Sequence, residues 1–199
     1  MSNDYHYIDS DYTYTDPKTG NLRNLANIDN NEALTFAETV SVSKRTSELK
    51  LKPIRIADSR SIFAIHKYLF QDIYDWAGKP RTVEISKGGK QFFPTSRFNT
   101  ALQYIDGLIV DYKRIPGNDK ARLSHKLAEI LDSVNYLHPF REGNGRMQRE
   151  LLRLLALEKG WKLNLNPPDN ADVYKRYMDG TISGDISALE ILILDHMLK

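Results

Sequence analysis

The spacing of apolar residues along the chain predicts mainly helices. From about residue 31, Leu34, Ala37 and Val40 recur at the interval of a helix face. A second helix is predicted from an N-terminal cap at Asp58 to a stop at Gly78. Its apolar face consists of Ile62, Ile65, Leu69, Ile73 and Trp76.

Further helices are predicted over about 95–114, 119–137 and 146–159, and two shorter ones over about 170–179 and 185–198. Glycine and proline residues stand between these segments and end the helices. No repeat and no low-complexity linker divides the sequence. We therefore expect a single domain over residues 1–199.

One segment alternates apolar and polar residues, as a β-strand does. Val83 and Ile85 are separated by polar residues, and the glycines at 88 and 89 can turn the chain back. A short β-hairpin is predicted over about 82–93, with a plain connecting loop as the alternative. The expected fold class is mainly α, a helical bundle from which this hairpin protrudes.

Residues 1–30 are rich in Tyr, Asp, Asn and Thr and carry turn signals. This segment is predicted to be an extended or irregular N-terminal arm. Aromatic rings favour burial, so its tyrosines are expected to pack on the main body. They are Tyr5, Tyr7, Tyr12 and Tyr14.

Composition narrows the class of protein. The 199 residues include 28 basic and 26 acidic side chains, a net charge of +2, which does not favour bulk nucleic-acid binding. The chain has no cysteine, which excludes disulfides, thiolate metal sites and a cysteine nucleophile. No apolar run approaches the roughly 20 residues of a membrane span, and the polar start does not resemble a secretory signal. A cytoplasmic location is the expectation.

The segment "HPFREGNGRMQRE", which begins at His138, concentrates the residues most suited to binding or catalysis. Pro139 predicts the end of one helix, and Arg146 begins the next apolar-periodic run. Gly143 and Gly145 therefore lie at a helix N-terminus, where backbone N–H groups can converge on a phosphate.

Charged side chains complete this predicted anion site. Arg146 and Arg149 are three residues apart, which predicts that they share one side of the first turn and offer donors to phosphate oxygens. Glu142 would repel a phosphate unless a cation such as Mg²⁺ lies between them. His138 is a candidate general base. Taken singly, each feature is more often structural; together they form a set suited to metal-assisted transfer from a nucleotide.

The segment "HPFREGNGRMQR" matches the signature HPFx[D/E]GNGRxxR at every specified position, so the chain resembles the Fic family. "IHKYLFQDIYDWAGKPRTVEISKGG" resembles the segment that leads into the Fic flap, and "YTYTDPKTGNLRNLANI" resembles the lead-in of stand-alone bacterial cell-filamentation-type Fic proteins. The resemblance implies the Fic fold. It also implies transfer of AMP from ATP to a Tyr, Ser or Thr hydroxyl of a target protein.

The family assigns roles to the matching residues. His138 would deprotonate the target hydroxyl, Phe140 would anchor the loop in the core, and Glu142 would bind the Mg²⁺ that bridges the α- and β-phosphates. The hairpin would be a flap that aligns the target by strand addition. The flap residues expected to dock the target are Ile85, Ser86, Lys87, Gly88 and Gly89.

The remaining motif residues would hold the nucleotide. The turn of Gly143, Asn144 and Gly145 would hold the phosphates, with Asn144 contributing its side chain. Arg146 and Arg149 would hold the β/γ end. Doc toxins, which phosphorylate their target, carry lysine where this chain has Gly145, so Gly145 favours AMP. Transfer of phosphate, phosphocholine or another nucleotide stays open.

Many Fic proteins carry an inhibitory helix with the pattern [S/T]xxxE[G/N]. No match is found: Glu38, Glu48 and Glu190 follow Leu34, Lys44 and Ile186 at the position of the Ser or Thr. The chain thus resembles the toxin class whose inhibitor is a separate small antitoxin. Relatives of this type suggest a bacterial target such as the ATPase subunit of a type II topoisomerase.

Three other classes are weighed against a transferase. A nucleotide-binding interaction module without turnover would have no need of His138 beside Glu142. A zinc hydrolase lacks support, because the other histidines show no HExxH-type spacing; they are His6, His66, His125 and His196. Direct nucleic-acid binding would rest on two basic clusters, which we interpret as solvated surface. They are Lys44, Arg45, Lys50, Lys52 and Arg55, with Lys87 and Lys90 on the hairpin.

Overall fold

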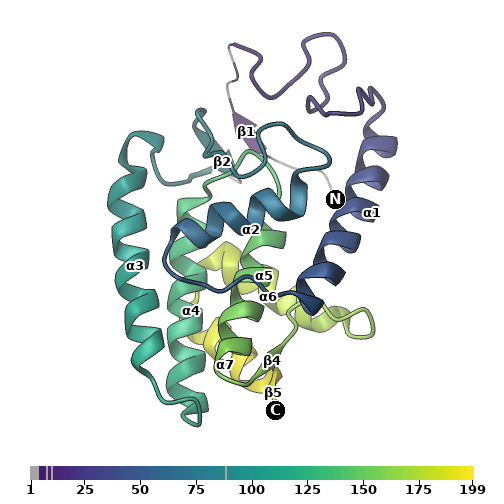
Figure 1. The fold of residues 1–199 in the computed structure, drawn as a ribbon. Helices are drawn as coiled ribbons and strands as arrows, with labels where there is room; N and C mark the ends of the chain where they lie inside the picture. The colour runs from purple at the N-terminus through teal and green to yellow at the C-terminus, as the bar shows by residue number, and fades with distance from the viewer. Residues whose placement is uncertain (1–4, 8, 10, 88) are drawn as a thin grey trace.

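Helices form most of the protein, as predicted, in a computed structural model that describes residues 5–7, 9, 11–87 and 89–199. The helices are α1 (Asn31–Leu51), α2 (Arg60–Phe70), α3 (Phe98–Arg114), α4 (Lys120–Leu137), α5 (Asn144–Glu158), α6 (Ala171–Ser183) and α7 (Ile186–His196). The strands are β1 (Tyr5–Tyr7), β2 (Ile85–Lys87), β3 (Lys90–Gln91), β4 (Lys162–Leu163) and β5 (Met197–Leu198). Figure 1 shows α3 and α4 side by side, α1 on the opposite side, and the β1–β2 pair above α2 in this view.

Side-chain caps start several helices where the sequence offers an Asn or Asp. Asn30 accepts a hydrogen bond from the Ala33 N–H, and Asp119 accepts one from the Arg122 N–H. The predicted cap at Asp58 is displaced by one residue: α2 has Ser59 as its cap residue, and Asp58 accepts from the Arg60 N–H.

Two helices have ends that differ from the prediction. The second helix ends at Phe70 and does not continue to Gly78. Ile73 and Trp76 of its predicted face are still buried, but they lie in the turns that follow. The sixth helix runs on to Ser183 and ends at Gly184, a glycine in the left-handed region.

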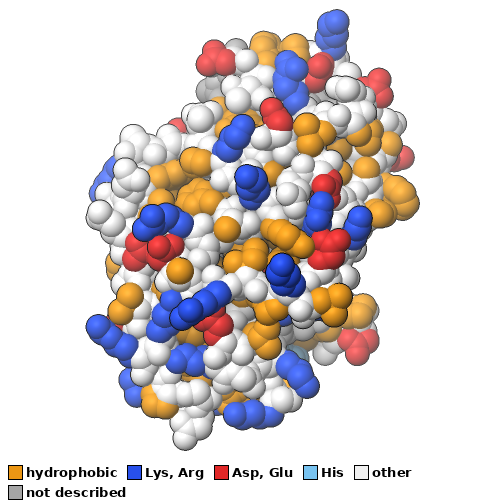
Figure 2. Space-filling view, viewed as in Figure 1, with side chains coloured by type: hydrophobic (Ala, Val, Ile, Leu, Met, Phe, Trp, Pro, Cys, Tyr) orange, Lys and Arg blue, Asp and Glu red, His pale blue; other side chains and the backbone are white. Residues whose placement is uncertain are grey.

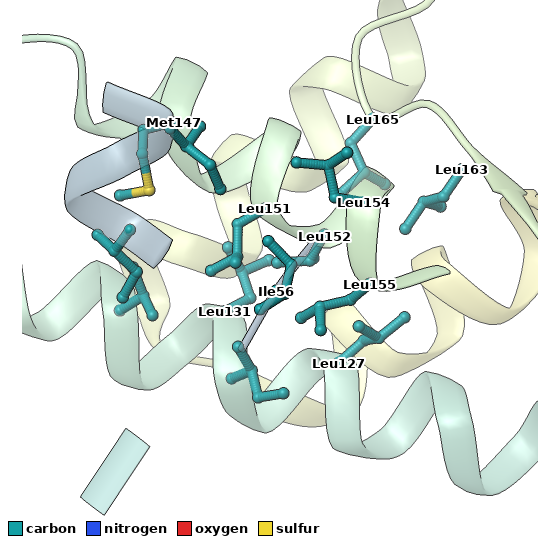
Figure 3. Packing of buried hydrophobic residues seen from close by; sticks show 14 of the residues in the cluster. Ile56, Leu127, Leu131, Met147, Leu151, Leu152, Leu154, Leu155, Leu163 and Leu165 are labelled. Atoms are coloured by element: carbon teal, nitrogen blue, oxygen red, sulfur yellow. The ribbon is translucent and has the colours of Figure 1, made fainter. Parts of the chain in front are cut away.

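The core is built around α5, which packs against α2 and α4. Figure 3 shows its leucines interleaved with Leu127 and Leu131 of α4 and with Ile56. Because apolar residues of α5 point to several neighbours at once, the helix is fixed in position along its length. Its fully buried apolar residues are Met147, Leu151, Leu152, Leu155 and Ala156.

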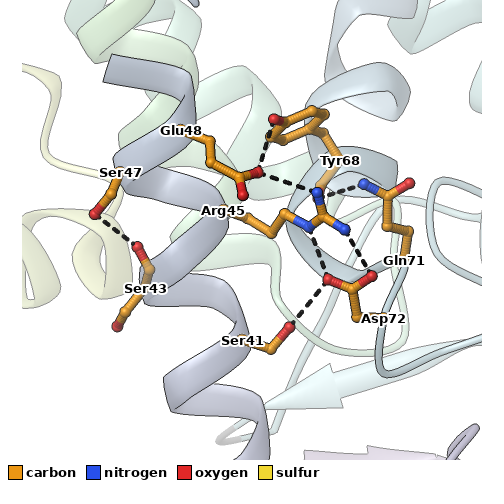
Figure 4. Close-up of polar contacts among 8 residues, drawn as sticks. All are labelled: Ser41, Ser43, Arg45, Ser47, Glu48, Tyr68, Gln71 and Asp72. Carbon is orange, nitrogen blue, oxygen red and sulfur yellow. Dashed lines mark hydrogen bonds and ion pairs between the residues drawn. The ribbon is translucent and has the colours of Figure 1, made fainter. Parts of the chain in front are cut away.

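The face that α1 buries differs from the predicted one. Leu34 is buried, but Val40 is 54% exposed and the carboxylate residue Glu38 is buried instead. A polar contact also holds α1 against the turn that follows α2: the guanidinium of Arg45 donates two hydrogen bonds of 2.7 Å to the Asp72 carboxylate (Figure 4).

The predicted hairpin is present and shorter than 82–93, with β2 and β3 pairing antiparallel. Gly88 lies outside the described residues. A third strand was not predicted: β1 pairs antiparallel with the other edge of β2, with His6 opposite Ser86. The β4–β5 pair was not predicted either, because strands of two residues carry no periodicity.

The N-terminal arm is anchored mainly by Tyr14. This ring is buried edge-on against Trp76, and its hydroxyl accepts a hydrogen bond from the Thr82 N–H at 3.0 Å. Tyr12 is 51% exposed, so the expected packing does not hold for it. The side chains of Tyr5 and Tyr7 lie outside the described residues.

Charged side chains of both signs are interspersed on the face in Figure 2, with no continuous basic band. Within the described part of the chain, none of the helices combines the length and apolar character that crossing a bilayer requires.

Candidate active site

The loop between α4 and α5 is shaped by two residues in the left-handed region. His138 has a φ of 43° where α4 ends, and Gly143 has a φ of 84° where α5 begins. A Cβ at Gly143 would overlap the Phe70 ring and lie 3.1 Å from Nε2 of His66. Only glycine therefore meets both the torsion and the close approach here.

Asn144 closes this loop from within. Its side-chain oxygen accepts from the Phe140 N–H at 3.0 Å, and its amide donates to the Phe140 carbonyl at 2.8 Å. The residue is buried. Both ends of the amide are thus bonded inside the loop, and the expected side-chain contact of Asn144 with phosphate stays a prediction.

Phe140 is fully buried, as the family resemblance implied for an anchor. Its ring stacks on His66 with centroids 3.7 Å apart and meets Phe63 edge-on. His66 lies on α2, four residues after Ile62 and three before Leu69, so it shares the buried face of that helix.

His66 belongs to the site, although the sequence identified it only as a histidine without metal-ligand spacing. The Gly78 N–H donates to Nδ1 at 2.9 Å, so the ring proton is on Nε2, which lies 2.9 Å from the Glu142 carbonyl oxygen and donates to it. Burial, with a smaller effect from Arg146, lowers the pKa of His66 to about 3. A neutral imidazole thus holds the backbone of Glu142.

His138, the candidate base, is buried beneath the flap. Its ring stacks on Phe92 with centroids 3.8 Å apart, and Nδ1 lies 3.3 Å from the Asn135 carbonyl oxygen. Burial is the main cause that lowers its pKa to about 3. The imidazole is therefore neutral near neutral pH, and a proton on Nδ1, facing that carbonyl, leaves Nε2 as a proton acceptor.

The predicted anion nest falls at the N-terminus of α5. The first turn of an α-helix leaves backbone N–H groups outside the helix ladder, and Gly143, Asn144 and Gly145 form this turn. A Cβ at Gly145 would lie 3.4 Å from the Arg149 guanidinium and 3.7 Å from the Tyr177 hydroxyl. A longer side chain there would fill the space over the nest.

The two motif arginines turn toward different elements, contrary to the prediction from their spacing. The Arg149 guanidinium lies over the rings of Tyr174 and Tyr177 of α6, 5.2 and 5.3 Å from their centroids. Arg146 instead forms an ion pair with Glu38 of α1 and lies over the Phe70 ring.

Glu142, the expected metal ligand, is partly exposed at the mouth of the loop. One carboxylate oxygen accepts from the Gly143 N–H at 2.9 Å and lies 3.5 Å from the Arg146 guanidinium. Among the described residues, no three metal-ligating side chains converge. A carboxylate beside an anion nest fits Mg²⁺, whose coordination phosphate oxygens and water would complete.

A cleft of about 950 Å³ opens beside His138 and Gly145. That volume is typical of a small-molecule site. The flap covers one wall through Lys87, Lys90 and Phe92, and α3, α4 and α6 form the others. Gln148 and Tyr177 lie at its inner end, where the Tyr177 hydroxyl donates to the Gln148 side chain at 2.8 Å.

The described flap residues occupy distinct positions. Ile85 is buried, Ser86 and Lys87 are half-buried, and Gly89 turns the hairpin with a φ of 77°. Lys87 lines the cleft, whereas Ile85 faces the body. The flap and the catalytic loop thus border the same space.

This fold and loop define a Fic-type protein, and residues 57–156 match the Fic/DOC family. The chain belongs to that family. It is 31% identical over 190 residues to the "probable protein adenylyltransferase y4lH" of Sinorhizobium fredii, an alignment that covers 93% of this chain and 94% of that protein.

Two further proteins are similar to most of the chain. Protein adenylyltransferase VbhT of Bartonella schoenbuchensis is 35% identical over 159 residues, which is 79% of this chain and only 33% of VbhT. The crystal structure of BepC from Bartonella tribocorum, with bound AMPPNP, superposes with a TM-score of 0.79 at 18% identity over 94% of this chain and 97% of that one. At that identity the likeness concerns the fold.

Proposed function

We propose that this chain is a protein adenylyltransferase, which transfers AMP from ATP to a hydroxyl side chain of a target protein. The observation that carries the proposal is the position of His138, a buried neutral base on the same cleft as the nest at Gly145. The relatives VbhT and y4lH carry the name of this activity, and BepC binds an ATP analogue.

In the proposed reaction, the target oxygen attacks the α-phosphorus of ATP. The hydroxyl proton passes to Nε2 of His138, the bond from the α-phosphorus to the bridging oxygen breaks, and pyrophosphate leaves. Burial lowers the pKa of His138 to about 3, so its imidazole is unprotonated near pH 7. The nest and Arg149 would stabilise the charge on the phosphates.

Glu142 is the residue that would hold Mg²⁺, which when bound neutralises charge on the α- and β-phosphates. Arg146 is paired with Glu38 and lies 3.5 Å from the Glu142 carboxylate, so it offsets part of the negative charge on that side of the site. Gly145 favours AMP over phosphate as the transferred group, because it leaves the nest open at the position where Doc toxins carry a lysine.

The biological role is proposed from the family resemblance. We place the chain in the cytoplasm as the toxin of a pair with a separate small antitoxin, acting on a bacterial protein such as a type II topoisomerase ATPase subunit. Glu38 supports the absence of a built-in inhibitor, since it pairs with Arg146 and not with Arg149, which the family's inhibitory glutamate engages.

Co-expression tests the toxin proposal. Growth arrest on expression of this chain alone should be relieved by one of the small proteins encoded beside its gene. If expression is harmless, or if none of those proteins changes growth or labelling, the toxin role is wrong while the chemistry stands.

The chemistry itself is tested with labelled ATP. Purified protein, Mg²⁺ and a bacterial lysate should give a labelled protein band from α-³²P-ATP and none from γ-³²P-ATP. His138→Ala should abolish the label while leaving affinity for Mg²⁺–AMPPNP within about twofold, since the variant removes the base and not the phosphate contacts. A band from γ-labelled ATP alone would mean phosphorylation, and near-normal transfer by His138→Ala would refute the mechanism.

A further inference from the structure

A buried arginine in the connection between α2 and β2 has no part in the chemistry described so far. Arg81 is only 2% exposed. Among the described residues its charged partner is Glu84, which lies 3.3 Å away and has a 61% exposed side chain. Burial lowers the pKa of Arg81, which reflects the cost of keeping a charge inside the protein. Because burial of this charge is costly, we looked for the interactions that it makes possible.

The guanidinium N–H groups donate hydrogen bonds to backbone carbonyls in three separate segments. Nη1 donates to Val83 at 2.6 Å, just before β2, and Nη2 donates to Phe93 at 2.7 Å, just after β3. Both legs of the flap are therefore tied to one planar group. The face of that group lies 5.0 Å from the centroid of Phe98, which fixes its plane.

The third donor reaches the catalytic loop. Nε of Arg81 donates to the His138 carbonyl at 2.9 Å, and the Arg81 backbone N–H donates to the next carbonyl, that of Pro139, at 2.8 Å. His138 is thus joined through a single side chain to both ends of the hairpin that stacks Phe92 on its imidazole. Three converging carbonyls match a rigid fork of donors and do not match the point charge of a lysine.

We propose that Arg81 is a positioning residue that sets the distance and angle between the flap and the His138 base. This inference rests on the proposed function, in which the flap presents a target hydroxyl to Nε2 of His138. A shift of about 1 Å between reacting groups can reduce a rate about 100-fold. A residue that fixes this separation therefore acts on transfer without touching the nucleotide.

The structure separates this role from nucleotide binding. The phosphate contacts come from the first turn of α5 and from Arg149, and the described hydrogen bonds of Arg81 reach neither. Loss of Arg81 should therefore lower the transfer rate while affinity for the nucleotide persists.

The test compares Arg81→Met and Arg81→Lys with the wild type and a matched control. The control is Arg153→Met, which removes another largely buried arginine, one that bonds Glu150 and the Leu49 carbonyl. Three quantities are measured: the melting temperature, the Kd of Mg²⁺–AMPPNP, and the initial rate of label transfer from α-³²P-ATP to the acceptor purified from the wild-type lysate reaction.

For Arg81→Met we expect a transfer rate lowered about 100-fold, a Kd within about twofold of wild type, and faster amide exchange in the flap. Arg81→Lys keeps the buried charge, which guards against misfolding, and should still lose at least about tenfold in rate because an ammonium does not reproduce the fork. Arg153→Met should melt earlier and transfer normally.

Two results would overturn the inference: transfer by Arg81→Met at the wild-type rate, or a loss of AMPPNP affinity as large as the loss of transfer. The second would make Arg81 a general support of the fold. If the wild type itself labels no protein, the proposed function fails and this inference fails with it. If the wild type transfers label and the Arg81 variants transfer it equally well, the role of Arg81 is refuted and the proposed function stands.

Discussion

At the scale of single residues, the site depends on side chains that hold backbone atoms in place. His66 uses both ring nitrogens in this way, one accepting from Gly78 and the other donating to the Glu142 carbonyl. A protonated imidazole has no acceptor, so protonation would break the bond from Gly78. The bond pattern and the low pKa of His66 thus have the same origin, a ring kept neutral by burial.

This neutrality predicts acid sensitivity of the fold. The pKa values of His66 and His138 fall from the ordinary 6.5 to about 3. Between those values the unfolded chain binds more protons, so stability is complete above about pH 6.5 and is lost as the pH falls toward 3. From pH 7 to pH 5 the loss is about 2 kcal/mol for each histidine.

Urea unfolding between pH 7 and pH 5 measures this loss. His66→Phe keeps a stacked ring without a titrating group, so its free energy of unfolding should be lower at pH 7 but should fall by about half as much on acidification. An equal fall in the variant and the wild type would show that His66 is not one of the responsible groups.

At the scale of elements, the flap is a three-stranded sheet and not an isolated hairpin. Strand β1 covers one edge of β2, which leaves the edge of β3 for other pairing. A two-stranded hairpin is marginally stable in water, so the third strand should reduce opening of the flap.

Deletion of residues 1–8 tests this contribution. The truncation spares Asp9, whose carboxylate organises the next turn through the N–H groups of Thr13, Tyr14 and Thr15. We expect amide exchange of Ile85–Lys87 to accelerate about tenfold or more while exchange in α4 and α5 is unchanged. Unchanged exchange in β2 would show that β1 adds no stability to the flap.

The longer elements were predicted from the sequence, and the shortest ones were not. Helices α3, α4 and α5 repeat their apolar positions over several turns, so their existence was correctly predicted. Strands β1, β4 and β5 are too short to carry a pattern. The face of α1 was predicted wrongly because Glu38 is buried against Tyr74 and Arg146, which both lie far along the chain.

The candidate site, too, was predicted only in part. The residues of the loop were identified from the motif, and the torsion at Gly143 and the burial of Phe140 follow from their types. The partners of Arg146 and Arg81 could not be predicted, because the direction of a long side chain depends on elements that meet only in the folded chain. Spacing alone placed Arg146 beside Arg149, whereas Glu38 draws it to α1.

At the scale of the whole molecule, the site forms where early and late segments of the chain meet. The α2 helix supplies His66, the connection after it supplies Arg81, and the α4–α5 loop supplies His138 and Glu142. All of them rest on the core around α5 (Figure 3). Because these parts share one core, a change in its packing is expected to reach the flap, the base and the nest together.

The ion pair between Glu38 and Arg146 has a consequence for the timing of synthesis. The ribosome makes Glu38 first and Arg146 108 residues later, a delay of about 5 to 20 s at ordinary bacterial elongation rates. During that interval α1 lacks the partner of its buried carboxylate, and no catalytic loop exists. A nascent chain therefore has no complete site until α5 has left the ribosome, and an antitoxin of the kind proposed above would have those seconds to reach it.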